Sequence, residues 1–152
     1  MTMVPEFTVE EAFLLLSQWV GRELDTLQAQ QRYVTHYKLF RGAQPWGWPL
    51  VPVRGGRFND SPVGTITHLY FARDCTGAVK VGISGKPDAR MREIGGNCQL
   101  ILVILECCKA HETALHRLLS PDHTMGEWFQ GDLTESLIKF LLAAAGEKAS
   151  AA

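Results

Sequence analysis

The sequence lacks the features of a chain that crosses or leaves a membrane. Its 152 residues contain no apolar run of the roughly 18 to 20 residues that a spanning helix needs, and no basic segment followed by an apolar one at the N-terminus. The four cysteines include an adjacent pair, Cys107 and Cys108, and show no CxxC spacing, which favours reduced thiols over a disulfide framework. We therefore expect a cytoplasmic protein without a membrane partner.

The chain also lacks a strong overall charge. Its formal net charge is -1, so it has no global basic character of the kind expected of a nucleic-acid coat protein. With 46% hydrophobic and 20% charged residues, the composition excludes disorder of the whole chain and predicts one globular domain with a real core. A nucleic-acid partner would have to be bound by local charge.

One segment has no acidic residue at all. Between Asp25 and Asp60 there is neither Asp nor Glu, whereas cations and aromatic rings are interleaved there. Cations that hold phosphates beside rings that stack on bases make a nucleic-acid surface. The residues that would bind are Arg41, Trp46, Trp48, Arg54 and Arg57. The alternative is a loop that packs its tryptophans on the domain and leaves its arginines in water.

The N-terminal part begins with a helix signal. Thr8 and Glu11 form a Thr-x-x-Glu capping pattern, and apolar residues follow at helical spacing. This pattern predicts a helix that starts near Val9 and ends between the high twenties and the mid thirties. Glycine and proline then dominate residues 41–62, which indicates a connecting segment without regular structure. Residues 1–62 would form an extension, either an accessory binding module or a brace for the fold.

A period-two pattern occupies residues 67–84. Two runs alternate apolar with polar or small side chains, which predicts two strands, each with one apolar and one polar face. The runs are residues 67–73 and 79–84, and Cys75-Thr-Gly77 between them suits a three-residue hairpin loop with Gly77 in the left-handed position. Such a loop pairs Tyr70 with Gly82 and places Tyr70 on the same face as Lys80, whereas a loop of two or four residues would pair it with an apolar residue.

The rest of the chain completes an α+β pattern. Pro87 opens a short helix that carries Arg90, and a continuous apolar run at residues 100–105 suits a third strand covered on both faces. A further helix carries Glu112 and His116 four residues apart, one turn above the other. We expect the order ββαβαα at residues 63–146, a three-stranded antiparallel sheet flanked by helices, behind the N-terminal helical extension. Residues 147–152 would be a frayed tail.

Five short pieces stand in a fixed order between His68 and Phe129. They are His68-Leu-Tyr70, Lys80-Val-Gly82, Arg90, Glu112-Thr-Ala-Leu-His116 and Gly126-Glu-Trp-Phe129. In order and spacing they resemble the GIY-YIG nuclease superfamily, most closely a phage-associated branch whose second motif reads Lys-Ile-Gly instead of Tyr-Ile-Gly. The resemblance covers the stretch from His68 to Phe129. Within it, Glu127 is either a partner of the site residues or an exposed carboxylate.

The resemblance implies hydrolysis of a nucleic-acid phosphodiester by an endonuclease with one divalent metal. The substrate would be DNA, with RNA as the alternative. Tyr70 matches the tyrosine that takes the proton from the attacking water, and Lys80 on the neighbouring strand would favour its phenolate. Arg90 would bind the scissile phosphate, Glu112 would hold the metal, and His116 would orient a phosphate oxygen or water.

The donor set favours a hard metal ion. One carboxylate with few other protein ligands suits Mg²⁺ or Mn²⁺, because Mg²⁺ keeps several waters and completes its shell with substrate phosphate. The rival interpretation is a zinc site from Cys107 or Cys108 with His111 or His116 and His123, whose spacing fits no standard arrangement. Without any metal, Glu112 and His116 would be ordinary helix residues.

Two functions of other classes stay open. A catalytically weak or inactive DNA-binding module would keep the fold and the phosphate site without efficient cleavage. The tyrosine of the superfamily's second motif is replaced by Lys80, and the superfamily's late asparagine has no clear counterpart here. This module would bind DNA without metal through the basic, aromatic segment. A protein-interaction module that uses the same segment would show no salt-sensitive affinity for nucleic acid.

Overall fold

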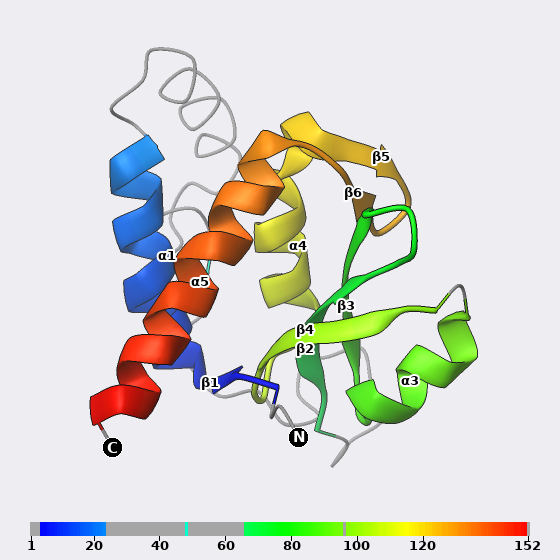
Figure 1. The fold of residues 1–152 in the computed structure, drawn as a ribbon, viewed down its shortest axis with the longest axis horizontal. Coiled ribbons are helices and arrows are strands. Elements are labelled where there is room, and N and C mark those ends of the chain that lie inside the picture. Colours follow the sequence, from blue (N-terminus) through cyan, green and yellow to red (C-terminus); the bar gives the residue numbers. More distant parts are fainter. Residues whose placement is uncertain (1–3, 24–47, 49–65, 96, 152) are drawn as a thin grey trace.

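The computed structural model describes residues 4–23, 48, 66–95 and 97–151. Six strands of this part form one mixed sheet in the order β1-β4-β2-β3-β6-β5. The strands are β1 (Glu6–Phe7), β2 (His68–Arg73), β3 (Val79–Ser84), β4 (Gln99–Ile104), β5 (His123–Met125) and β6 (Trp128–Phe129). The helices are α1 (Val9–Glu23), α3 (Pro87–Ile94), α4 (Lys109–Leu118) and α5 (Asp132–Ala151), with a 3-10 turn η3 (Ser120–Asp122). The fold is α+β (Figure 1).

The sheet is wider than the sequence predicts. Its centre, β4-β2-β3, is antiparallel as expected, but β1 joins β4 in parallel, and β6 and then β5 extend the β3 edge. The prediction of three strands is therefore corrected to six. The added strands have two or three residues each, too few for a period-two pattern to be recognised.

The central hairpin has the predicted register. Tyr70 pairs with Gly82, and the Asp74 N–H donates to the Ala78 carbonyl at 3.0 Å. Gly77 has a φ of 90°, so it occupies the positive-φ position that the three-residue loop requires. The Asp74 carboxylate accepts the Ala78 N–H and holds the loop closed. Tyr70 and Gly82 consequently lie side by side on one face of the sheet.

The start of α1 follows the predicted capping pattern. The Thr8 N–H donates to Glu11 Oε1 at 2.8 Å, and the Glu11 N–H donates to Thr8 Oγ1 at 3.1 Å. The expected end of this helix, beyond residue 23, lies outside the described residues. The apolar face of α1, with Leu16 and Trp19, belongs to the same core cluster as β2, β3 and β4. The described part of the extension thus packs into the main core.

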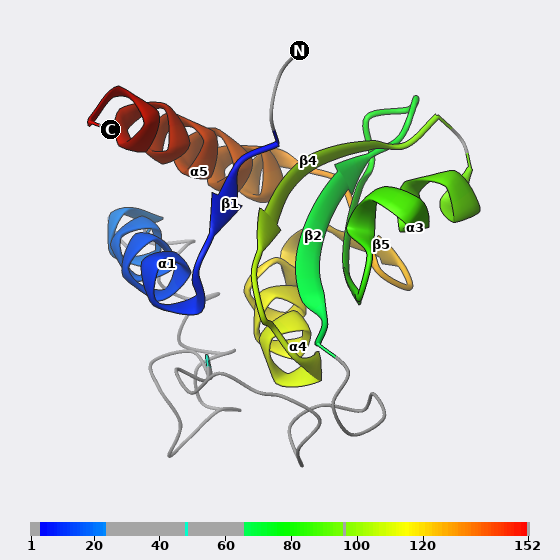
Figure 2. The same cartoon turned by 90° about the horizontal axis from the view of Figure 1, so that it is seen from below.

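The two faces of the sheet are covered unequally. Figure 2 shows α3 on one side of β2 and β4, and α1 and α5 on the other. The side facing α1, α4 and α5 holds the large apolar cluster that includes Leu69 and Phe71. The side facing α3 holds a small cluster in which Tyr70, Ala72 and Val103 are buried. Tyr70 therefore lies on the thinly covered face.

The C-terminal end differs from expectation. Residues 147–151, predicted as part of a frayed tail, continue α5 to Ala151. Alanine, glutamate and lysine are strong helix formers, and Lys148 contacts Glu11 of α1 at 3.0 Å. With 20 residues α5 is the longest helix described, yet no described helix is both long and apolar enough to cross a membrane.

Candidate active site

The centre of the candidate site is the hydroxyl of Tyr70 above Gly82. A Cβ atom added to Gly82 would lie 2.8 Å from the Tyr70 hydroxyl oxygen and 2.9 Å from Glu127 Oε1. Both oxygens therefore occupy the space that a side chain would fill at this position. Tyr70 itself is 1% exposed. The glycine is required here because it lets a buried phenol and a carboxylate approach the same point of the β3 backbone.

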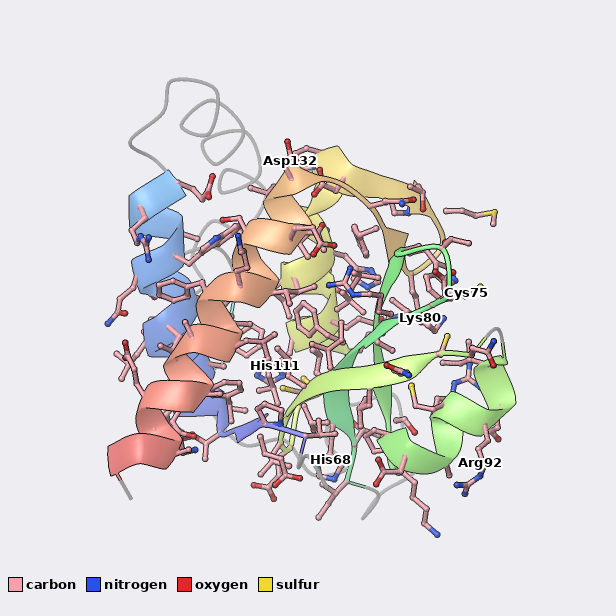
Figure 3. All side chains as sticks on the ribbon, in the orientation of Figure 1. His68, Cys75, Lys80, Arg92, His111 and Asp132 are labelled. Carbon is pink, nitrogen blue, oxygen red and sulfur yellow. The ribbon has the colours of Figure 1, made fainter. Side chains whose placement is uncertain are left out.

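Lys80 belongs to this site through Glu127. Lys80 Nζ lies 3.0 Å from Glu127 Oε1, and its ammonium stands 5.4 Å from the centre of the Trp128 ring. The Lys80 side chain is 12% exposed and that of Glu127 is 35% exposed, so the ammonium is largely shielded from water while the carboxylate stays partly exposed. Figure 3 shows Lys80 near the hairpin end of β3. The sequence left the position of Glu127 open, and the structure makes it a partner of Lys80.

The protonation of Tyr70 is set by its surroundings. Burial raises the pKa of Tyr70 above its ordinary value, a hydrogen bond with the Arg90 side chain lowers it, and the charges of Glu127 and Glu112 raise it again. The net effect is a raised pKa, so Tyr70 is a neutral phenol at pH 7. The cation that lowers the pKa of Tyr70 is thus Arg90 of α3, whereas Lys80 is paired with Glu127.

Glu112 presents an unpaired buried oxygen. Its side chain is 1% exposed in the first turn of α4, and Oε1 accepts a bond from Lys109 Nζ. Oε2 is buried and has no hydrogen-bond partner in the part of the chain described. A buried carboxylate oxygen left without a partner is costly, and a bound cation would remove that cost. The charge of Glu112 also reaches Tyr70, whose pKa it raises.

This oxygen fits the expected metal ion. Mg²⁺ and Mn²⁺ prefer oxygen ligands, and Mg²⁺ is commonly held by one or two carboxylates, with waters and substrate phosphate in the remaining positions. Among residues 4–23, 48, 66–95 and 97–151 no group of three or more His, Cys, Asp or Glu residues could hold a metal. Glu112 would therefore bind such an ion in a site with fewer than three His, Cys, Asp or Glu ligands from the described residues.

His116 lies beside the site but is oriented toward the backbone. Its Nε2–H donates to the Val81 carbonyl at 2.7 Å, and its ring packs against Phe129 with centroids 5.1 Å apart. The Val81 N–H in turn donates to the Glu127 carbonyl at 3.0 Å. His116 therefore anchors α4 to the strand next to Gly82. Only Nδ1 is left for the predicted contact with a phosphate oxygen or water.

The side chains of the rival zinc interpretation serve other purposes. Cys107 and Cys108 are buried, and burial raises the pKa of the Cys107 thiol well above its ordinary value. His111 Nδ1 accepts the Cys108 N–H at 2.9 Å, and His123 Nε2 bonds to the Gly126 carbonyl at 2.9 Å. They take part in no three-ligand group within the described ranges.

Trp48 corrects part of the nucleic-acid prediction. It is 0% exposed, its Nε1–H donates to the Val9 carbonyl at 3.2 Å, and its ring meets His111 edge-on at 4.5 Å. A ring packed in this way cannot stack on a base, so the alternative of a core tryptophan describes Trp48. The other predicted binding residues, Arg41, Trp46, Arg54 and Arg57, lie outside the described residues.

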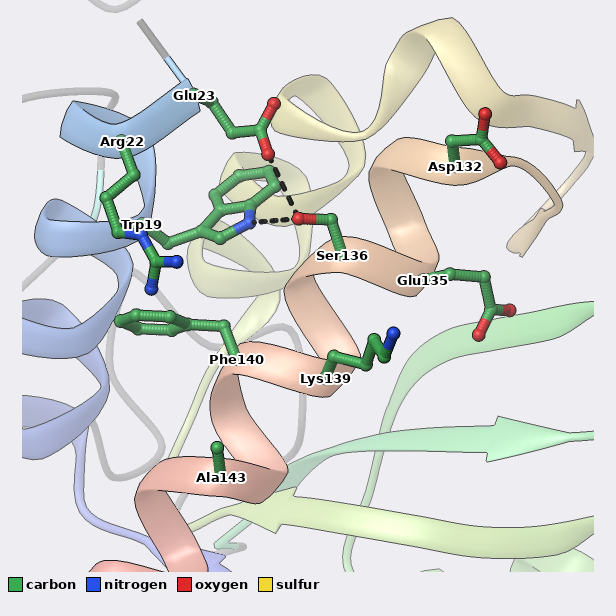
Figure 4. A pocket seen from close by; sticks show the side chains of 9 residues that line it. All are labelled: Trp19, Arg22, Glu23, Asp132, Glu135, Ser136, Lys139, Phe140 and Ala143. Atoms are coloured by element: carbon green, nitrogen blue, oxygen red, sulfur yellow. Dashed lines mark hydrogen bonds between the residues drawn. The ribbon is translucent and has the colours of Figure 1, made fainter. Parts of the chain in front are cut away.

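A cavity of about 750 Å³ lies elsewhere, between α1 and α5 (Figure 4). Three of its polar side chains bond to one another: Trp19 Nε1–H donates to Ser136 Oγ at 3.1 Å, and the Ser136 hydroxyl donates to Glu23 Oε1 at 3.0 Å. The cavity shares no lining residue with the Tyr70 site. Its size therefore does not make it the site of chemistry.

Comparisons of the chain with family models, with curated proteins and with solved structures found no match. Support for a function comes from the residues themselves. The described structure brings together Tyr70, Lys80, Arg90 and Glu127, with Glu112 close enough to act on Tyr70 through its charge.

Proposed function

We propose that the protein is a metal-dependent endonuclease that hydrolyses phosphodiester bonds of nucleic acid, DNA in the first place. One observation carries the proposal: the Tyr70 hydroxyl lies against Arg90 and within reach of the charge of Glu112, whose Oε2 is buried without a partner. These groups come from β2, α3 and α4. They are a base, a phosphate-binding fork and a metal ligand, the roles that the resemblance to the GIY-YIG superfamily implies.

Arg90 and Glu112 would prepare the substrate. The planar guanidinium of Arg90 can donate two hydrogen bonds to one phosphate group, and its charge offsets the negative charge that develops in the transition state. Glu112 would hold Mg²⁺ or Mn²⁺ through Oε2. A bound ion of this kind polarises the phosphodiester and stabilises charge on its oxygens.

Tyr70 would activate the attacking water. Its phenolate takes a proton from water, the water oxygen forms a bond to phosphorus, and the bond from phosphorus to the leaving oxygen breaks, after which that oxygen takes a proton from solvent. Tyr70 is a neutral phenol in the free protein, so it must first lose its proton to solvent. Neutralisation of the Glu112 charge by a metal ion favours this step, because that charge is one of the influences that raise the pKa of Tyr70.

A second candidate is the DNA-binding module without efficient cleavage. One observation favours it: the raised pKa of Tyr70 makes this residue a poor base. In that case Arg90 would bind phosphate, and DNA binding would need no metal. Substitution of Glu112 would then leave the affinity for DNA unchanged.

The deciding experiment is a cleavage assay on supercoiled and linear DNA with Mg²⁺, Mn²⁺ or EDTA. We expect metal-dependent cleavage by the wild type, and losses of about 10² to 10⁴ in rate for Tyr70→Phe and Glu112→Gln. Glu135→Gln is the control, because Glu135 is a glutamate of α5 that pairs with Arg73 outside the site. Thermal unfolding of each variant shows whether it is folded.

The outcomes separate the candidates. Cleavage that persists in EDTA, or that Glu112→Gln leaves intact, contradicts the metal-dependent mechanism. If the wild type shifts DNA in a gel but cuts it in none of the three conditions, the binding module becomes the better description. An RNA of the same sequence, tested beside the DNA, decides which nucleic acid is cut.

A further inference from the structure

Glu127 is the charged residue of the site that the motif roles leave unused. Its carboxylate has two neighbours over Gly82: Oε1 is 3.0 Å from Lys80 Nζ and 2.9 Å from the point where a Gly82 Cβ would lie. The Tyr70 hydroxyl is 2.8 Å from that same point. The carboxylate therefore lies close to both the Lys80 ammonium and the Tyr70 hydroxyl.

The position of Glu127 is fixed by the backbone. Its carbonyl accepts the Val81 N–H at 3.0 Å, and the next residue, Trp128, pairs with Lys80 across β3 and β6. The Trp128 ring also lies against the Lys80 ammonium. The backbone of β3 and the residues at the start of β6 thus hold the two partners of the ion pair next to each other.

This arrangement limits the charge that Lys80 can offer. An ammonium shielded from water and paired with a carboxylate presents little net positive charge to a third group. Three charged groups act on Tyr70, namely Arg90 on α3, Glu112 on α4 and Glu127 just before β6, and Lys80 on β3 is paired with the last of them. A phosphodiester bound by Arg90 would bring a further negative charge close to the Lys80 ammonium.

We propose that Glu127 is a positioning residue that holds the Lys80 ammonium over Gly82, beside the Tyr70 hydroxyl, and competes with the substrate phosphodiester for it. This inference rests on the proposed function of the site. It gives Lys80 a different role from the one suggested by the sequence: Lys80 binds phosphate when Glu127 releases it, and it is kept in place by Glu127 until then.

The first test is DNA binding in EDTA, measured by fluorescence anisotropy with a labelled duplex. Glu127→Gln should tighten binding by about threefold to tenfold, because it frees one partly buried cation for phosphate. Lys80→Met should weaken binding, and Glu127→Gln added to Lys80→Met should give no tightening. Glu11→Gln is a matched control, because Glu11 also pairs with a lysine at 3.0 Å, far from the site.

Measuring kcat and KM with metal present distinguishes a positioning role of Glu127 from a purely structural one. Glu127→Gln should lower kcat by about tenfold, since the ammonium is no longer fixed, while KM falls along with the dissociation constant. Tightening that also occurs in the Lys80→Met background overturns the inference, because Glu127 would then act only as a general negative charge. Equal affinities of Glu127→Gln and the wild type also overturn it.

A titration of Tyr70 tests the same placement without any nuclease activity. The chain has three tyrosines, so Tyr33→Phe with Tyr37→Phe leaves Tyr70 as the only source of tyrosinate absorbance. In that background Glu127→Gln should lower the titration midpoint of Tyr70, and the fall should be larger with Lys80 present than in Lys80→Met. Circular dichroism over the same pH range confirms that the protein stays folded.

The titration separates the two proposals. If the wild type neither cuts nor binds DNA, the proposed function fails, yet a Lys80-dependent shift of Tyr70 would still place Glu127 as described. If DNA is cut but the midpoint of Tyr70 is the same in Glu127→Gln and the wild type, the positioning role fails and the nuclease stands.

Discussion

Tyr70 and Phe71 are neighbours on β2 and are equally buried, but they face opposite sides of the sheet. Phe71 points into the large apolar cluster covered by α1, α4 and α5. Tyr70 points into the small cluster beneath α3, where its hydroxyl meets Arg90 and the space above Gly82. The comparison shows that burial alone does not tell a stability residue from a site residue. The chemistry of the partner atoms does.

The two faces also differ in how firmly they are covered. None of the residues of α3 is buried, and this helix contributes only partly buried Met91 and Ile94 to the cluster around Tyr70. The opposite face receives fully buried side chains from three helices. The molecule therefore keeps most of its apolar burial on one face and places Tyr70 and Arg90 at the thinner cover of the other, where ligands can enter, while Glu112 comes from α4.

The largest effect expected is on the apolar face. Phe71→Ala should lower the free energy of unfolding by about 3–5 kcal/mol, because it removes a fully buried ring and leaves a cavity among packed neighbours. Chemical denaturation measures the loss. Tyr70→Phe is the comparison on the other face: it keeps the ring and should cost only about 1 kcal/mol of stability. A similar loss for both would remove the distinction between the faces.

A smaller effect is expected from closing the space beneath Tyr70. Gly82→Ala places a methyl group within 3.0 Å of the Tyr70 hydroxyl and of Glu127, and this overpacking should cost about 1–3 kcal/mol. Cleavage should fall with it, since the hydroxyl must move. Gly21→Ala on α1 is the control, because nothing lies within 4 Å of its Cβ, and a helical alanine should raise stability by about 1 kcal/mol. Unchanged cleavage by Gly82→Ala would contradict the proposed site.

The pH dependence follows from the raised pKa of Tyr70. Because its folded-state pKa lies above the unfolded value of about 10, the protonated phenol contributes stability that is fully present below about pH 10. This contribution is lost as pH rises through the folded-state pKa. The stability of the wild type should therefore fall relative to that of Tyr70→Phe as the pH is raised above about 10. Denaturation of both proteins over this range checks the sign, and a constant difference would contradict it.

The pH dependence of the cleavage rate should also report the ionisation of Tyr70. The phenolate is the active form, so the metal-dependent rate should rise by about tenfold per pH unit below the pKa of Tyr70. The residual rate of Tyr70→Phe should lack this rise. A flat profile in the wild type would mean that another group activates the water.

The hairpin and its register could be predicted because several local signals agree. Alternation in two runs, a loop of three residues and Gly77 all require the same pairing, and Tyr70 opposite Gly82 follows. The capping pair Thr8 and Glu11 is a similar case, since its atoms are close in sequence. Such features depend on neighbours along the chain.

Features that depend on distant contacts were not predictable in this way. Nothing local marks Trp48 as a core residue, and the carbonyl that accepts the hydrogen bond from His116 Nε2–H belongs to Val81, 35 residues away. The cation at Tyr70 is another example. Lys80 lies on the neighbouring strand but is paired with Glu127, and Glu127 is placed there by β6, a two-residue strand too short to give a recognisable pattern.

The smallest effect expected concerns the ion pair between β2 and α5. Arg73 donates to both carboxylate oxygens of Glu135, at 2.7 and 3.0 Å, but the side chains are 35% and 44% exposed. Solvent screening therefore limits the pair to about 0–1 kcal/mol, and Glu135→Gln should lose no more than this, and less at high salt. Cleavage and DNA binding should not change.

The pair of Lys80 with Glu127 is less exposed than the pair of Arg73 with Glu135, and it lies at the site. We therefore expect Glu127→Gln to change activity more than it changes stability. If Glu135→Gln altered cleavage as strongly, charge anywhere near the sheet would matter, and the assignment of function to one face would fail.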